Sequence, residues 1–233
     1  MTYRIDFHSH TGHSGDSLTP ARILLDAARR RGIAALAVTD HNTLDGALQA
    51  QALVTHDPER YGGLIILPGE EVKTSEGELI GLFLHTTIPR GLSPEETIDR
   101  IRDQGGLVLV PHPFDRLRGS RIRADTVERV AERVDAIEVF NARTTFAADN
   151  QRAVAFAQHH DLPMVAGSDA HVPWEVGYGY VELDEPPATT AQELLAQLRA
   201  GRIGGRSSVP LVHFGSTLAK WRKRLGLAPA VRL

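Results

Sequence analysis

The sequence predicts a mixed α/β protein whose parallel sheet is closed into a barrel or covered by helices. Short apolar runs alternate with helical stretches along most of the chain. The runs are continuously apolar, which is typical of strands buried on both faces of a parallel sheet. Barrels of about 200 to 250 residues routinely form one domain, and this chain has 233 residues. We therefore expect a single domain over 1–233, ending in a basic helix or tail at 215–233.

The apolar runs place strands at 3–8, 34–39, 64–68, 79–84, 107–110, 136–140 and 163–166. The helices are recognised by the residues that begin and end them. Thr19 and Pro20 begin the first helix and Gly32 ends it, while Ser93 and early acidic residues begin a helix that stops at Gly105. Helices are expected at 19–31, onward from 44, and at 93–105, 125–133, 146–160 and 190–200.

One connection breaks the alternation of strand and helix. Only six residues, 72–77, separate Glu71 from Glu78. A crossover between parallel strands needs about a dozen residues or more. The segment 78–84 is therefore expected to return as an antiparallel hairpin strand, which brings Glu78 beside Glu71.

Composition excludes several classes of protein and site. There is no cysteine, so neither a disulfide framework nor a thiolate site is possible. The net charge of −3 does not favour a polyanion binder by bulk charge. The N-terminal residues contain no apolar stretch typical of a signal peptide, and no run reaches the roughly 18 apolar residues of a membrane span. We expect a cytoplasmic protein with no membrane partner.

Histidines and carboxylates gather where the predicted strands end. Because the carboxyl ends of parallel strands meet at one edge, these side chains are expected to share a site. His8 and His10 are two residues apart, so they face the same side of an extended strand, and Asp169 and His171 repeat that spacing. Imidazole and carboxylate ligands without thiolate suit Zn, Mn or Fe(II). The sequence therefore predicts a metal site at this edge.

Five motifs follow one another along 6–171: Asp6-Phe7-His8-Ser9-His10-Thr11, Thr39-Asp40-His41-Asn42-Thr43, Gly69-Glu70-Glu71, Val110-Pro111-His112-Pro113 and Gly167-Ser168-Asp169-Ala170-His171. Together they resemble the PHP (polymerase and histidinol phosphatase) superfamily, in that family's order. The resemblance implies a distorted TIM-like (β/α)7 barrel of about seven strands with a metal site at the C-terminal rim of the strands. Within the family, the chain is most similar to the small stand-alone metal-dependent phosphoesterases.

The resemblance also implies a site for two or three divalent ions (Mn, Zn or Fe), with Glu71 as a bridge. The first ion would take His8, His10, Glu71 and Asp169; the second Glu71 and His112; the third Asp16, His41 and His171. Asp16 stands where the family supplies His or Asp, six residues after His10, and His13 is the alternative.

The hairpin departs from the family's pattern. Relatives place a His there, and the corresponding residue in this chain is Glu78. His85, at the far end of the same strand, is the alternative. The hairpin geometry favours Glu78, and a carboxylate at this position favours Mn or Fe over Zn.

Three further residues are candidates for catalytic contacts near the metals. Asp40 is a candidate for orienting a ligand histidine. Arg116 and Arg143 follow strands at the same edge, where a guanidinium suits a phosphate group, although arginines on loops are often only solvated. Glu138 and Asn141 are candidate hydrogen-bond partners inside the rim.

The resemblance implies an enzyme, a metal-dependent phosphoesterase whose activated water attacks a phosphate ester. The substrate would be a small phosphomonoester, a nucleotide or a short oligonucleotide, with short RNA as a further candidate partner. No phosphate-loop glycine pattern is present, which favours hydrolysis over nucleotide-driven transfer. Two alternatives stay open: a hydrolase of a carbamate, ester or amide, and a non-catalytic module stabilised by metal. The oligomeric state is open.

The C-terminal tail carries basic residues and no acid from residue 216 onward. Leu218, Trp221 and Leu225 fall on one face of a helix. The preferred interpretation is that this apolar face docks on the barrel while the basic face is solvated. The alternative is that the basic face gathers a polyanionic substrate or the acidic surface of a partner.

Overall fold

The structure, a computed structural model, describes residues 1–209 and 212–227. Its strands are β1 (Tyr3–Asp6), β2 (Ile33–His41), β3 (Ile65–Thr74), β4 (Gly77–Leu82), β5 (Leu107–Val110), β6 (Ala136–Asn141), β7 (Met164–Gly167), β8 (Gly179–Leu183) and β9 (Arg202–Gly205). Its helices are α1 (Ala21–Arg30), α2 (Asp45–His56), α3 (Pro58–Tyr61), α4 (Pro94–Arg102), α5 (Ala124–Val130), α6 (Ala147–His159), α7 (Ala191–Leu198) and α8 (Val212–Arg224), with 3₁₀ turns η1 (Ala131–Arg133) and η2 (Pro173–Glu175).

The strands form one sheet in the order β7-β6-β5-β4-β3-β2-β1-β8-β9. Strands β1, β2 and β3 are parallel to one another, and so are β5, β6 and β7. Strand β4 is antiparallel to both of its neighbours, and β8 and β9 continue the sheet antiparallel beyond β1. The predicted α/β class and the predicted hairpin strand are confirmed.

The sheet curls until its two halves nearly close into a barrel. Strand β1 pairs with β8 only along its first residues. The chain that follows β1 pairs instead with the chain that follows β7, through a parallel bridge between Ser9 and Ala170. The Asp169 N–H donates to the carbonyl of His8 at 2.8 Å, and the His10 N–H donates to the carbonyl of Ala170 at 2.9 Å. The barrel is therefore closed at the end where the predicted ligands lie.

The turn between β3 and β4 depends on Gly77. Its φ of +133° lies where side chains are rarely found, and a Cβ there would lie 2.1 Å from the Cα of Ile122. The turn sets the register in which Glu71 pairs with Ile80 and Lys73 with Glu78. Glu71 and Glu78 are therefore diagonal neighbours on the two strands.

Two apolar clusters fill the two sides of the sheet. Successive strand residues face opposite sides, and on β2 Ala35 and Ala37 belong to one cluster while Leu36 and Val38 belong to the other. The first cluster lies inside the barrel and is continued by α7. The second packs the outer face of the sheet against the flanking helices, chiefly α1, α2, α4, α5 and α6.

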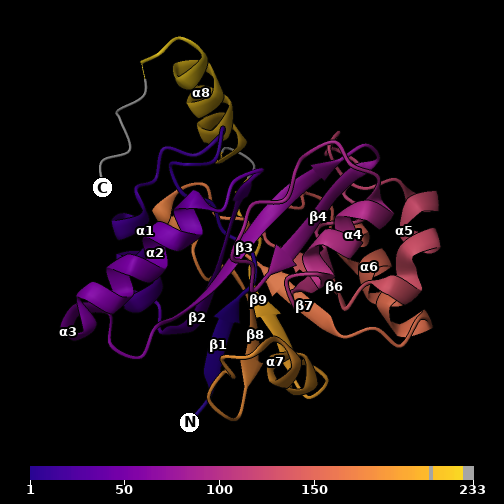
Figure 1. Cartoon of the computed structure of the whole chain (residues 1–233), viewed down its shortest axis with the longest axis horizontal. Helices are drawn as coiled ribbons and strands as arrows, with labels where there is room; N and C mark the ends of the chain where they lie inside the picture. The colour runs from indigo at the N-terminus through magenta and orange to yellow at the C-terminus, as the bar shows by residue number, and fades with distance from the viewer. Residues whose placement is uncertain (210–211, 228–233) are drawn as a thin grey trace.

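Figure 1 shows how the helices are placed around the sheet. Helices α1 and α2 cover the part of the outer face formed by β2 and β3, and α4, α5 and α6 cover the part formed by β4 to β6. Helix α7 lies near the end where β1 begins, whereas α8 lies over the opposite end. The described chain contains no helix with the length and apolar character that crossing a membrane requires.

Candidate metal centre

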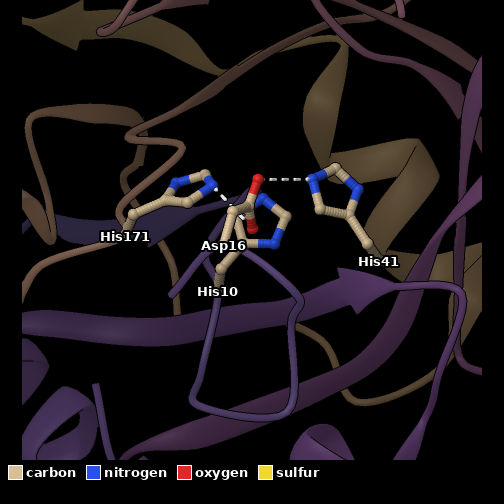
Figure 2. A group of neighbouring side chains, drawn as sticks. All are labelled: His10, Asp16, His41 and His171. Atoms are coloured by element: carbon tan, nitrogen blue, oxygen red, sulfur yellow. Dashed lines mark ion pairs between the residues drawn. The ribbon is translucent and has the colours of Figure 1, made fainter. Parts of the chain in front are cut away.

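Four of the predicted ligands meet above the carboxyl ends of the strands (Figure 2). Asp16 lies in the loop between β1 and α1, and its carboxylate points at two histidines. Its Oδ2 is 3.2 Å from His41 Nε2, at the end of β2, and its Oδ1 is 3.2 Å from His171 Nε2, beyond β7. His10 completes a group whose donor atoms lie within 4.8 Å of one another. One carboxylate and three imidazoles therefore face a common point.

Glu71 lies on β3 and is fully buried. Its Oε1 is 3.0 Å from His112 Nε2. Its Oε2 is 3.0 Å from His41 Nδ1 and 3.4 Å from His8 Nε2. The two oxygens face different histidines, which suits a carboxylate shared between two cations. This geometry supports the bridging role predicted for Glu71, which stays a proposal.

All the predicted ligands belong to one continuous cluster, because its four groups share members. In each group, one donor atom of every residue lies within 4.8 Å of the others. The groups are His10, Asp16, His41 and His171; His8, Glu71 and His112; His8, His10 and Asp169; and His41, Glu71 and Glu78. The structure therefore brings together residues from six separate segments of the chain into a cluster able to bind metal ions.

The backbone holds two of these donors in unusual conformations. His112 follows β5 with a φ of 31°, and Asp169 follows β7 with a φ of 51°. Positive φ at residues other than glycine costs about 1–3 kcal/mol, and it persists where the surrounding structure enforces it. Here Glu138 accepts a 2.7 Å hydrogen bond from the His112 N–H, and the His8 carbonyl accepts one from the Asp169 N–H. These bonds fix both donors toward the cluster.

The buried donor atoms fit divalent cations. His8 Nε2 and His10 Nε2 are 3.1 Å apart, and at most one of two facing neutral nitrogens can donate a proton to the other. Burial and the neighbouring histidines lower the pKa of His10 to about 3, so its ring stays neutral. Glu78 Oε2 is buried without a hydrogen-bond partner among the described residues. Closely spaced imidazole and carboxylate donors, one of them unpartnered, are suited to holding a cation.

The pKa values of Glu78 and His41 show that protons and cations compete for the donor atoms of the cluster. Burial raises the pKa of Glu78, and the adjacent carboxylate of Glu71 raises it further. Burial opposes the charged form of His41, but Glu71 and Asp16 outweigh it and raise the pKa of His41 to about 10. The cluster therefore balances its carboxylates with protons when no cation is bound, so metal binding releases protons.

The structure places Asp16, and not His13, inside the cluster. His13 Nε2 is 3.2 Å from Gln49 Oε1 on α2, and its side chain lines the wall of a cavity. The short loop turns back after Gly12, so the nearer histidine along the sequence is not the nearer donor in space. The alternative that proximity in sequence suggested is not supported.

The structure likewise places Glu78, and not His85, in the cluster. Glu78 shares the inner face of β4 with Ile80, the partner of Glu71. His85 lies beyond β4, is exposed, and donates its N–H to Gln104 Oε1 at 3.0 Å. The antiparallel direction of β4 explains the difference, because the start of this strand, where Glu78 lies, is at the rim, and its end, which leads to His85, is not.

Two buried carboxylates outside the cluster hold its backbone and rings in place. Glu138 on β6 lies 3.2 Å from His8 Nδ1, and it accepts hydrogen bonds from the His112 N–H and the Asn141 side chain. The prediction that Glu138 and Asn141 are hydrogen-bond partners inside the rim is confirmed. Asp6 accepts from backbone N–H groups beyond β1 and β7, and burial raises its pKa to about 6.

Asp40 lies in a different place from the one expected of a catalytic residue. Both of its oxygens accept hydrogen bonds from Thr11, one from the N–H and one from the hydroxyl, each at 2.6 Å. A Cβ on Gly46 would lie 1.8 Å from Asp40 Oδ2, so glycine is required where α2 begins. Asp40 is fully buried and fixes the loop that leads to Asp16. It acts on the loop, and in the described part of the chain its oxygens bond to Thr11 and not to a ligand histidine.

The arginines also differ from expectation. Arg116 pairs with Asp149 on α6 at 2.6 Å, and about half of its side chain is exposed. It lies outside the cavity described below, which corrects its predicted place. Arg118, two residues further on, reaches the cluster and contacts Asp169 Oδ2. Arg143 is buried and lines the cavity as expected, with its Nε 3.4 Å from Glu175 Oε1. Residues in a loop follow no fixed period, so the sequence could not show which arginine points inward.

A cavity of about 1270 Å³ opens over the cluster. Part of its wall consists of the predicted ligands Asp16, His41, Glu78 and His171. The rest is rich in cationic side chains from several elements: Lys73, Arg90, Arg118, Arg143, Lys220, Lys223 and Arg224.

Helix α8 presents its basic face to this cavity. The expectation that Leu218, Trp221 and Leu225 dock on the barrel is wrong, since these side chains are 53%, 59% and 52% exposed. Lys223 instead donates to the backbone carbonyls of the β1–α1 loop. Carbonyls and carboxylates at this end of the barrel attract ammonium groups, which explains why the helix turns its polar side inward.

Comparisons with known proteins agree with this architecture. A family model described as PHP domain matches residues 6–80, and one described as PHP-associated matches residues 147–203. The uncharacterized proteins MJ1587 and MJ0417 of Methanocaldococcus jannaschii are similar in sequence. MJ1587 is 41% identical over 150 residues, which are 60% of this chain and 82% of that protein. MJ0417 is 36% identical over 185 residues, which are 78% of this chain and 71% of that protein.

Three solved structures share the fold at low sequence identity. PsfC from Pseudomonas syringae has a TM-score of 0.68 and 22% identity, covering 96% of this chain and 99% of its own. A protein of Bifidobacterium adolescentis assigned as a metal-dependent phosphoesterase has a TM-score of 0.60 and 18% identity, covering 73% and 88%. An amidohydrolase of Chromobacterium violaceum, solved with bound sulfate and no metal, has a TM-score of 0.62 and 19% identity, covering 86% and 97%.

The matches include eight of the nine residues of the cluster, while His112 lies between the two matched segments. The PHP domain model runs from the last residue of β1 into β4, with the ligands from His8 to Glu78, and the second model covers β7, with Asp169 and His171. Because both family models match, and relatives of 41% and 36% identity are covered over most of their length, the chain is a member of the PHP superfamily.

Proposed function

We propose that the protein is a metal-dependent hydrolase and, more specifically, a phosphoesterase that hydrolyses a phosphate ester with metal-activated water. The family and the donor cluster support the first part. The observation that carries the second is the presence of Arg118 and Arg143 in the same cavity as the cluster. Planar guanidinium groups bind the oxygens of phosphate with paired hydrogen bonds.

Divalent cations held by the cluster would polarise a phosphoryl oxygen and lower the pKa of a water molecule, so that hydrolysis proceeds at neutral pH. The residues that would hold them are the nine of the cluster, with Glu71 between two of the positions. Because the donors are imidazole and carboxylate, Mn, Fe and Zn are the proposed ions, two or three per chain.

The chain's own side chains would bind and orient the ester. Arg118 contacts Asp169, a member of the cluster, so a phosphate placed there touches the cluster and the guanidinium together. Burial opposes the charged form of Arg118, but Asp169 and Glu71 raise its pKa, so it stays a cation in the cavity. Arg143 lies just after the C-terminal end of β6 and would contact the same phosphate group. Its ion pair with Glu175 fixes the direction of its side chain.

A second candidate function is a metal-dependent hydrolase that cleaves an acyl bond instead of a phosphate ester. The Chromobacterium violaceum neighbour is an amidohydrolase, and water activated in the same way also cleaves amides, esters and carbamates. The cationic cavity favours a phosphate ester, since a neutral amide gains little from several cations.

The test is a parallel assay of metal-loaded protein. Phosphomonoesters such as 4-nitrophenyl phosphate and nucleoside monophosphates are compared with 4-nitrophenyl acetate and simple amides, using Mn, Fe(II) and Zn in turn. We expect turnover of phosphate esters that is lost in Glu71→Gln and lowered in Arg118→Gln. Turnover confined to acyl substrates would support the second candidate, and no turnover with any ion would leave a non-catalytic metal-binding module.

A further inference from the structure

Helix α8 forms a wall of the cavity through cationic side chains. Lys220, Lys223 and Arg224 all line it. They lie at i, i+3 and i+4, which is one face of a helix. The opposite face carries the exposed Leu218 and Trp221. The helix is therefore oriented toward the cavity by its charged side.

One of these lysines fastens the helix to the loop that carries Asp16. Lys223 Nζ donates to the carbonyls of Gly12 and Ser14. Its side chain is half-buried, unlike its neighbours Arg222 and Arg224, which are exposed. A lysine held by two carbonyls has little freedom to bind anything else, so its role is to position α8.

The other two cations are directed at the cavity itself. Lys220 Nζ is 3.3 Å from Asp16 Oδ2, and 57% of the Lys220 side chain remains exposed. It therefore reaches from the outer wall to the edge of the donor cluster. Arg224 stands one turn further along and faces the cavity without a protein partner among the described contacts.

The cavity has room for more than the group that reacts. Its volume of about 1270 Å³ exceeds the range of about 300–1000 Å³ for typical small-molecule pockets. Arg118 and Arg143 are the proposed ligands of the phosphate group that reacts beside the cluster. Among the cations of α8, Lys220 lies beside Asp16, whereas Arg118 contacts Asp169. Together these cations exceed what a single phosphate group needs.

We propose that Lys220 and Arg224 bind a second anionic group of the substrate, separate from the phosphate at the donor cluster, while Lys223 positions the helix. This inference rests on the proposed phosphoesterase function and narrows its substrate class to phosphate esters that carry a further anion. The preference arises because a second anion meets two cations that line the cavity, and hydrogen bonds between charged groups are strong.

The experiment uses two non-hydrolysable ligands that differ by one anionic group. Phenylphosphonate carries one phosphonate, and 1,4-phenylenebisphosphonate carries two at opposite ends of a rigid ring, too far apart to chelate one ion. Their dissociation constants are measured by titration calorimetry with the metal-loaded full chain. We expect the bisphosphonate to bind at least about tenfold more tightly, as hydrogen bonds to charged groups provide.

Three variants assign the effect to residues. In the double variant Lys220→Gln/Arg224→Gln, the bisphosphonate should lose its advantage while phenylphosphonate binds as before. Arg222→Gln removes one charge from the same helix outside the cavity and should keep the advantage. Lys220→Arg keeps the charge and should keep it too. Circular dichroism and metal content confirm that each variant is folded and loaded.

The outcomes separate the inference from the function on which it rests. Phenylphosphonate that binds with no gain from the second group overturns the inference alone. An equal loss in Arg222→Gln also overturns it, because the effect would then be long-range charge rather than contact. If neither ligand binds the loaded protein, the phosphate-ester function is wrong and the inference is wrong with it.

Discussion

Adjacent glutamates on β3 have different surroundings because successive strand residues face opposite sides of the sheet. Glu71 faces the donor cluster. Glu70 faces the outer side, where its Oε2 accepts a 2.9 Å hydrogen bond from the Ile88 N–H. Burial raises the pKa of Glu70 to about 7. Burial also favours the neutral form of Glu71, but His41 and His8 outweigh it and hold the pKa of Glu71 well below its usual range. Glu70 therefore carries less charge at neutral pH than Glu71.

Glu71→Gln should leave the chain folded but lower the metal content by at least one ion per chain. The amide has the same size but lacks the charge that attracts a cation, and we expect the rate to fall by about 100-fold or more. Elemental analysis and kcat on the same sample check both effects. Glu70→Gln is the matched control, since it should keep the metal. The reverse result would place the bridge at Glu70.

The loop between β1 and α1 permits a second paired test. Asp16→Asn should weaken the binding of one ion by about 10-fold or more, because the carboxylate faces both His41 and His171. His13→Gln should leave metal affinity unchanged, because His13 lies outside the cluster. Titration with Zn in competition with a chromophoric chelator measures both. A loss confined to His13→Gln would show that the loop rearranges when metal binds.

At the scale of elements, the loop after β5 is attached to α6 by an ion pair. Asp149, in the first turn of α6, accepts from the Arg116 N–H and guanidinium. Hydrogen bonds from Arg116 lower the pKa of Asp149 below its ordinary value, although burial acts in the opposite direction. A carboxyl with a depressed folded-state pKa stabilises the fold above its unfolded pKa. That contribution is lost as the pH falls through the folded-state value.

Arg116→Gln should therefore lower the Tm at pH 7. The difference from the unchanged protein should shrink as the pH falls below about 4, where the carboxylate takes up a proton. Thermal unfolding across this pH range measures it. Because Arg116 lies outside the cavity, kcat/KM should not change. A drop in kcat/KM at an unchanged Tm would return Arg116 to the site.

Much of this arrangement could be predicted from the sequence, and the failures share a physical cause. Strands such as β5 are apolar runs that local pattern reveals, and the donors at their ends follow from the parallel direction. Strand β9, with two glycines and no apolar run, carries no such pattern. The orientation of α8 and the choice between Arg116 and Arg118 depend on the charge of distant segments. No local pattern contains that information.

For the whole molecule, metal and stability should be coupled. The cluster holds buried carboxylates and imidazoles drawn from distant parts of the described chain, from His8 to His171, and cations would satisfy them in the folded state only. An ion present at about 100 times its Kd should raise the free energy of unfolding by about 2.7 kcal/mol. Loading with Mn or Zn should therefore raise the Tm, and a strong chelator should lower it.

Elemental analysis of protein purified without chelators should find at least two ions per chain, as the several donor groups allow. Differential scanning calorimetry of loaded and chelated samples measures the change in Tm. A content well below one ion, or a Tm that does not respond to metal, would contradict the assignment of the cluster.

The closure of the barrel by the segments beyond β1 and β7 bears on how the protein is made. Within the described barrel, His8 and His10 are synthesised before most of the strands, whereas Asp169, which contacts both, is synthesised after most of them. A nascent chain that ends before β7 has the first histidines without their partner and without the bridge between Ser9 and Ala170. Tight binding of the ion that Asp169 would hold with His8 and His10 is therefore expected only after residue 169 has been synthesised. An ion at that position would thus report that the segments beyond β1 and β7 have come together.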